Sequence, residues 1–217
     1  SRSLQCNGGT VFVDHASGFI HIQNQISLRA GETVQAKHAF EQCVDQFGVT
    51  VKKHRADNHP FTSTEFKADL KLQNQDMKLS GVGAHHQNGV AERAIQTVTS
   101  WALAMMLHQL LHWPKAFDAK LWPFALEHAV NLWNHLPKQR GGLTPMELFT
   151  GLKLPRHDVV TRARVWGCPA WVLDHRLQNG HKLPKWTKRT ALGVYVGASA
   201  FHSETIGRIL NLSTQHI

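Results

Sequence analysis

The chain has 217 residues, of which 42% are apolar and 18% charged, values typical of a globular protein and not of a disordered one. Lysine and arginine outnumber aspartate and glutamate by 24 to 15, and the resulting net charge of +9 favours a polyanionic partner. Three scattered cysteines without a Cys-x-x-Cys pair argue against a disulfide framework and a zinc knuckle, and no stretch has the pattern of a signal peptide or a membrane span.

The first third of the chain predicts a hairpin followed by a helix. Two apolar, β-branched runs, Thr10–His15 and Phe19–Gln25, flank a short Ala-Ser-Gly turn, which is typical of a β-hairpin. Over residues 31–48, apolar side chains recur at steps of three and four, so we expect an amphipathic helix that Gly48 terminates.

The next elements alternate strand and helix. Residues 49–57 predict a strand, and residues 77–80 a second, shorter one. Between them, Thr62 and Glu65 have the spacing of a capping box for a helix that runs to about Asn74. A strand–helix–strand order predicts an α/β fold with parallel pairing.

The second half of the chain is helical first and strand-like later. Pro114 and Pro137 limit two long apolar segments, and Thr144, Pro145 and Gly151 have the positions of a helix cap, a first helical residue and a helix stop. The patterns predict helices over 89–112, 116–136 and 145–150, and strands within 164–173 and 189–199.

Two carboxylates stand out by their positions. Asp57 ends a predicted strand of an α/β sheet, where such folds carry their chemistry, and Glu92 lies in the first turn of a predicted helix. Glu92 points away from the apolar stripe that contains Ala94 and Val98. Paired carboxylates bind hard cations such as Mg²⁺ or Mn²⁺, which serve phosphoryl transfer in pairs. An acid in a first helical turn also complements the helix dipole, and the residues alone leave both interpretations open.

Seven segments together resemble the integrase region of copia-type retrotransposon polyproteins over residues 9–217. In chain order they read VFVDHASG, HRADNHPF…EF, HHQNGVAERAIQT, LWPFALEHAVNLWN, GLTPMELFTG, RVWGCPAWVLD and LPKWTKR…GVYVGAS. The resemblance implies an α/β, ribonuclease H-like integrase core with an Asp, Asp, Glu triad that binds two Mg²⁺ or Mn²⁺ ions. Asp57 matches the second acid of the triad and Glu92 the third, so both are the expected catalytic and metal-binding residues.

The resemblance leaves the first acid of the triad open. The fold needs three strands before its first helix, whereas the sequence predicts two, so we expect the first strand and its acid to lie upstream of Ser1. Asp14 is the alternative first ligand; its other expected role is to end a strand beside a turn. We expect an integrase core over residues 1–151 and an incomplete, β-rich extension over residues 152–217.

Several polar residues are candidates for nucleic-acid contacts. They lie in and just after the loop that resembles the mobile active-site loop of the family, namely His85, His86, Gln87, Asn88, Arg93 and Gln96. An ordinary solvated loop is the alternative for the histidines. Residues 182–189, KLPKWTKR, fit either a nucleic-acid-binding strip or a charged connection between strands.

The resemblance implies DNA integration, in which a 3′-hydroxyl of element DNA attacks a phosphodiester of target DNA. DNA and further copies of the chain are the expected partners, without a membrane, in the nucleus and in cytoplasmic retrotransposon particles. We expect these 217 residues to be inactive alone, as part of a longer polyprotein. The alternatives are a truncated, non-catalytic copy that still binds nucleic acid, and a ribonuclease H-type nuclease that uses water as its nucleophile.

Overall fold

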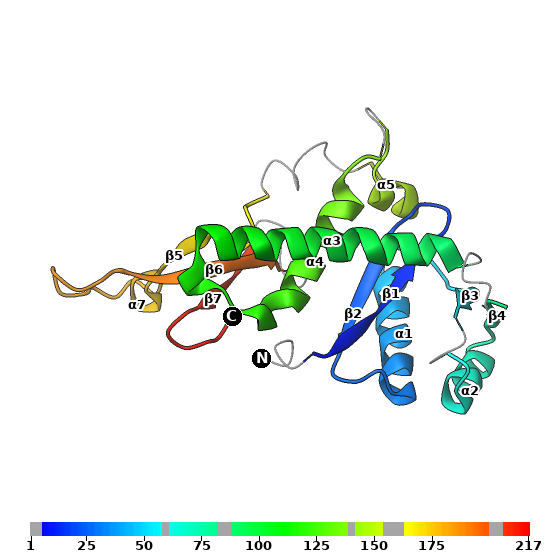
Figure 1. The fold of residues 1–217 in the computed structure, drawn as a ribbon. Helices are drawn as coiled ribbons and strands as arrows, with labels where there is room; N and C mark the ends of the chain where they lie inside the picture. The colour runs from blue at the N-terminus through cyan, green and yellow to red at the C-terminus, as the bar shows by residue number, and fades with distance from the viewer. Residues whose placement is uncertain (1–5, 58–60, 82–87, 139–141, 154–162, 200–205) are drawn as a thin grey trace.

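The computed structural model describes residues 6–57, 61–81, 88–138, 142–153, 163–199 and 206–217 (Figure 1). Helices and small sheets alternate along the chain, as the sequence predicts, and one long helix runs along most of the molecule. Within these ranges, no helix combines the length and the apolarity needed to cross a membrane.

The predicted hairpin is confirmed. Strand β1 (Gly8–Val13) pairs antiparallel with β2 (Ile20–Gln25), with Val13 opposite Ile20. Gly18 closes the turn at φ +71°, and its amide donates to the Asp14 carbonyl over 2.8 Å. This left-handed backbone conformation suits glycine, which has no Cβ to clash.

Helix α1 (Ala30–Asp45) packs against this hairpin through aromatic contacts. The rings of Phe12 in β1 and Phe40 in α1 stack with their centroids 4.6 Å apart, and Ala36 and Val44 are buried beside them. Gly48 follows the helix at φ +72° and donates to the Asp45 carbonyl, so the predicted stop is confirmed.

A second, parallel pair of strands follows, made of β3 (Lys53–Ala56) and β4 (Asp76–Leu79) with α2 (Thr64–Leu72) between them. The predicted capping box is wrong, because α2 is capped by Ser63, whose hydroxyl accepts from the Phe66 amide over 3.2 Å. Ser63 is the residue directly before the helix and has the extended backbone that a cap requires.

The strand pairs β1–β2 and β3–β4 are separate sheets. Within the described ranges, no backbone ladder joins them, and two strands precede α1. Each pair therefore keeps unpaired strand edges, a condition that a further strand between the pairs would relieve.

Helix α3 (Gly89–His112) has the predicted bounds, but the predicted helix over 116–136 is wrong in its first part. Two short 3₁₀ turns, η3 (Pro114–Ala116) and η4 (Ala119–Leu121), precede α4 (Trp122–His135). The backbone is extended at Asp118, whose carboxylate caps η4, and Pro123 lacks the amide hydrogen that an interior helix position needs.

Helix α5 (Pro145–Thr150) follows with the predicted Thr144 cap. The Glu147 amide donates to the Thr144 hydroxyl, and the Thr144 amide donates to the Glu147 carboxylate, which completes a capping box. Gly151 ends the helix at φ +71°, also as predicted.

The C-terminal residues form a three-stranded antiparallel sheet in the order β5–β6–β7, from β5 (Pro169–Leu173), β6 (Thr190–Ala198) and β7 (Gly207–Asn211). A short helix, α7 (His175–Gln178), follows β5. The sequence analysis did not predict β7, which lies in the last residues of the chain.

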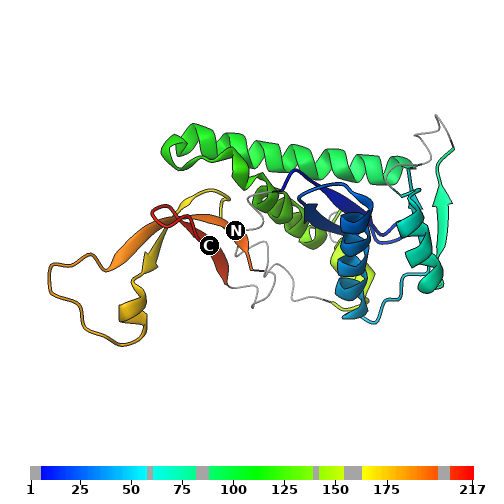
Figure 2. The same ribbon diagram turned by 90° about the horizontal axis from the view of Figure 1, so that it is seen from below.

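The main hydrophobic core continues from α3 and α4 into this sheet, and Figure 2 shows the sheet beneath the C-terminal part of α3. Val98 of α3, Ala125 of α4 and Val196 of β6 are all buried in one cluster. Arg208 of β7 also donates to Glu127 of α4 over 2.7 Å. The predicted boundary after residue 151 therefore separates segments that share a core, and the division into domains stays a prediction.

Candidate active site

Asp57 follows β3 directly, and a serine at the end of the neighbouring strand orients its carboxylate. Ser80 follows β4, which is parallel to β3, and its amide donates to the Ala56 carbonyl over 3.0 Å. The Ser80 hydroxyl donates to Asp57 Oδ1, also over 3.0 Å. Asp57 is half-buried and Ser80 is buried, so Asp57 is held at the carboxyl edge of a parallel sheet, where α/β folds place reactive groups.

Glu92 lies in the first turn of α3 with an exposed side chain. Ala94 and Val98 are buried on the other side of the helix, so the predicted direction of Glu92 is confirmed. Within the described residues, the Glu92 carboxylate has no hydrogen bond and no ion pair, and the N-cap residue Asn88 makes no side-chain cap bond either. Any capping contribution of Glu92 is thus limited to the helix dipole.

Both carboxylates belong to the same end of the molecule. Parallel strands direct their carboxyl ends to one edge, and α3 begins only a short segment after β4 leaves that edge. Figures 1 and 2 agree in placing β3 and β4 at the N-terminal end of α3. The assignment of Asp57 and Glu92 as metal ligands stays a prediction, as does their separation.

Asp14 is engaged in the hairpin turn. Its Oδ2 atom accepts from the Ser17 amide over 2.7 Å and from the Ser17 hydroxyl over 2.6 Å. This is the strand-ending turn contact that short acidic side chains commonly make. Its alternative assignment as the first triad acid would require one carboxylate oxygen to leave these contacts, and that assignment stays a prediction.

The predicted nucleic-acid contacts divide between described and undescribed residues. Arg93 and Gln96 are exposed on the first turns of α3, and Arg93 Nε donates to the Gly89 carbonyl over 3.3 Å. Asn88 is half-buried at the start of α3. The other three, His85, His86 and Gln87, lie outside the described residues.

A buried charge cluster behind β3 was missed by sequence reasoning. Lys37 of α1 is fully buried, and its Nζ lies 2.9 Å from Glu41 and 2.7 Å from Asp69 of α2. Burial alone would raise the Asp69 pKa, but the ion pair with Lys37 and the hydrogen bond with His38 outweigh it, so that pKa is below its usual value. We name Lys37, Glu41 and Asp69 the Lys37 cluster.

The Lys37 cluster reaches the strands that carry the candidate site. Gln75, just before β4, donates through Nε2 to Glu41 over 2.7 Å and to the Val51 carbonyl over 3.0 Å. His54 of β3 lies 3.5 Å from Glu41, and burial lowers its pKa. The available signal was a lysine on the apolar face of a predicted helix, next to Ala36 and Phe40, with a glutamate four residues later.

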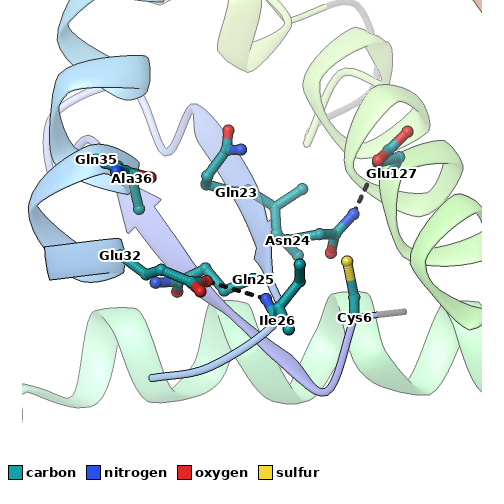
Figure 3. Close-up of a pocket in the computed structure, with 10 residues that line it drawn as sticks. Cys6, Gln23, Asn24, Gln25, Ile26, Glu32, Gln35, Ala36 and Glu127 are labelled. Atoms are coloured by element: carbon teal, nitrogen blue, oxygen red, sulfur yellow. Dashed lines mark hydrogen bonds between the residues drawn. The ribbon is translucent and has the colours of Figure 1, made fainter. Parts of the chain in front are cut away.

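A polar pocket of about 230 Å³ lies elsewhere, between β2, α1 and α4 (Figure 3). Its acids already have structural roles, because Glu32 accepts from the Ile26 and Ser27 amides and Glu127 accepts from Asn24 Nδ2 over 2.8 Å. None of the predicted site residues lines it.

Comparison with solved structures shows the class of fold. The catalytic core domain of BIV integrase superposes with a TM-score of 0.50 at 21% identity, covering 65% of this chain and 84% of that chain. A chain of the simian T-cell lymphotropic virus intasome in complex with PP2A regulatory subunit B56 gamma gives a TM-score of 0.52 at 16% identity, covering 93% of this chain and 68% of that chain. No family model and no curated protein sequence matches.

The fold is therefore the ribonuclease H-like fold of retroviral integrase catalytic cores, as the sequence analysis expects. Because these sequence identities are low, the comparison identifies the fold only, and any chemistry has to be argued from the residues of this chain.

Proposed function

We propose that this chain is part of a polynucleotidyl transferase that integrates DNA, with Asp57 and Glu92 as two of its metal-binding acids. The observation that carries the proposal is the presence of both carboxylates at one end of an integrase-like fold, one oriented by Ser80 and the other without a partner in the described part of the chain. Placing an acid on a strand end and another on a helix start lets two elements converge on one ion.

The donor set fits a divalent metal of the Mg²⁺ or Mn²⁺ type. Asp57 and Glu92 supply carboxylate oxygens, which hard cations prefer, and Ser80 fixes the direction of the Asp57 carboxylate. The bound ions would activate an attacking oxygen and stabilise a leaving oxygen. The chain's own contribution is to orient the acids and to position phosphates near Arg93 and Gln96, both exposed on the first turns of α3.

The finer parts of the proposal come from the sequence resemblance. They are a copia-type element as the source, a first triad acid upstream of Ser1, self-association, and action on element and target DNA in the nucleus. The separate pairs β1–β2 and β3–β4 support the upstream strand, because a strand between them would join the two sheets.

A strand-transfer assay tests the proposal. The natural chain, extended upstream to include the next strand, is given labelled duplex DNA ends, a target plasmid, and Mg²⁺ or Mn²⁺. We expect joined products, and we expect Asp57→Asn and Glu92→Gln each to reduce the rate by at least about 10²-fold, because each removes a carboxylate that would hold the divalent ions. The matched control is Asp45→Asn, which changes an exposed acid at the end of α1.

The products distinguish the competing functions. Cleaved DNA without joined products would favour the water-using nuclease. DNA binding without any chemistry in the extended chain would favour a non-catalytic copy. Equal activity in Glu92→Gln and the parent would refute the site itself.

A further inference from the structure

The connection between β5 and β6 forms an exposed arm far from the candidate active site. This arm, residues 174–189, includes α7 and leaves the C-terminal sheet at one end of the molecule, whereas β3 and β4 lie at the other end in both views (Figures 1 and 2). Its residues are exposed apart from a few half-buried positions around α7 and at Leu183, so packing does not explain their side chains.

The arm concentrates positive charge. It contains Arg176, Lys182, Lys185, Lys188 and Arg189 against one acid, Asp174, so it contributes +4 of the net charge of +9. Asp174 is already paired, since Arg176 donates to it through Nε over 3.1 Å and through Nη2 over 3.0 Å. The hydrogen bonds from Arg176 lower the Asp174 pKa to about 2, so this acid stays charged and engaged.

The other four cations of the arm are Lys182, Lys185, Lys188 and Arg189. Among the described residues, none of them forms an ion pair with an acid. Four unpaired charges within eight residues repel one another, and a polyanion would relieve that repulsion.

An aromatic ring lies among these charges. Trp186 is 92% exposed, and Lys185 Nζ lies 5.9 Å from the centre of its ring. On the adjoining strand, Trp171 is 69% exposed opposite Leu192. Indole rings are normally buried or held at interfaces because they carry a large apolar surface, so an almost fully exposed tryptophan between lysines is typical of a contact surface.

We propose that this arm binds single-stranded nucleic acid, with phosphates at Lys182, Lys185, Lys188 and Arg189 and an unpaired base stacked on Trp186. Closely spaced cations and an exposed aromatic ring are the two components of single-strand binding that tolerates different sequences. Bases within a duplex are already stacked on each other, so only an unpaired base can use the Trp186 face. The binding is independent of the chemistry proposed for Asp57 and Glu92.

Fluorescence anisotropy on the 217-residue chain tests the proposal with labelled 20-nucleotide oligothymidine, oligouridine and a duplex of equal length. We expect Trp186→Ala to weaken binding of the single strands at least about fivefold and to leave duplex binding within about twofold. The thermal midpoint should not change, because the ring is exposed. Oligothymidine and oligouridine distinguish a DNA from an RNA ligand.

A charge-matched pair of variants separates the arm from the general surface charge. Lys185→Gln with Lys188→Gln should weaken single-strand binding and reduce its salt dependence by between one and two in the logarithmic slope. Lys67→Gln with Lys71→Gln removes two exposed lysines of α2 and should leave both unchanged. The proposal fails if the two pairs act alike, if Trp186→Ala binds single strands as the parent does, or if anionic lipid vesicles bind the arm more tightly than either oligonucleotide.

Discussion

The two ends of α3 are built differently. At the N-terminal end, the candidate site depends on a two-stranded sheet, one serine–aspartate hydrogen bond and the Lys37 cluster behind β3. At the C-terminal end, the sheet β5–β6–β7 shares a hydrophobic core with α3 and α4. Polar contacts are directional and apolar burial is not, so the first end can fix the orientation of side chains while the second is stabilised by the burial of apolar surface in the main core.

Because of this difference, substitutions at the two ends should have different effects. Changes at the N-terminal end should affect local order around β3 and β4 more than the whole fold. Changes at the C-terminal end should affect the global free energy of unfolding, because its residues belong to the common core. The predictions below test this separation, from the largest expected effect to the smallest.

Lys37→Met should have the largest effect, and that effect should fall on the local stability of the N-terminal end. The variant leaves the mostly buried carboxylates of Asp69 and Glu41 without their cation. We expect this loss to cost about 3 kcal/mol, at the lower end of the range for a broken buried ion pair, because both acids retain some exposure. Hydrogen exchange should increase over β3 and β4 before it increases over β6. Lys71→Met, an exposed lysine of α2, should change stability by less than about 0.5 kcal/mol. Uniform exchange changes would contradict the proposed separation.

Acid should weaken the C-terminal end through His128. Burial, with a smaller effect from Arg208, lowers the His128 pKa from 6.5 to about 4, so the folded chain keeps this ring neutral while the unfolded chain protonates it. Its stabilising effect is complete above pH 6.5 and is lost as the pH falls toward 4, at a cost of about 2–3 kcal/mol.

Denaturant unfolding at several pH values measures this effect. His128→Gln should flatten the dependence of the unfolding free energy on pH between 6.5 and 4, although His21, with a pKa also lowered to about 4 by burial, retains a similar contribution. His175→Gln changes an exposed ring and should keep the parental slope. If the unfolding free energy of His128→Gln depends on pH as that of the parent does, His128 is not the source of the acid effect.

Gly167→Ala should destabilise the contact between the C-terminal sheet and α3 by about 2–3 kcal/mol. Gly167 has φ +79°, and a Cβ there would lie 2.7 Å from Gln109 Cγ, so the variant combines backbone strain with overpacking. Gly180→Ala has the same φ of +79° and no atom within 4 Å of the added Cβ, so it isolates the strain and should cost about 1 kcal/mol. Thermal unfolding of the two variants gives the difference.

Thr144→Ala should have the smallest effect, about 1 kcal/mol, because it removes one half of the capping box of α5. Ser63→Ala removes the simpler cap of α2 and should cost no more. If the Ser63 variant loses more stability than the Thr144 variant, the β3–β4 end contributes more to the global free energy of unfolding than its small share of the hydrophobic core indicates. Chemical denaturation resolves differences of this size.

Local signals predicted much of the fold. The hairpin, α1 and α3 carry apolar patterns, and α5 carries a capping box and a helix-ending glycine, so most of their bounds follow from the sequence. The missed features depend on tertiary context. The helix expected over 116–136 is interrupted at Asp118, and β7 forms because β6 offers it a partner.

The candidate site was likewise predicted only where the signal is local. Asp57 and Glu92 were identified from the motif and from their places at a strand end and a helix start. The Ser80 contact could not be predicted, because it requires the parallel register of β3 and β4, which places the residues after Ala56 and Leu79 side by side. In the Lys37 cluster, the pair with Glu41 has a local signal, but the contact with Asp69 requires the packing of α2 on α1, which no local pattern of either helix encodes.

Helix α3 also sets a distance within the molecule. Its 24 residues span about 36 Å, with Glu92 in the first turn and Gln109, buried under Gly167, near the last. The helix is continuous between these two positions, so it sets the distance between the candidate site and the C-terminal sheet that packs on α3.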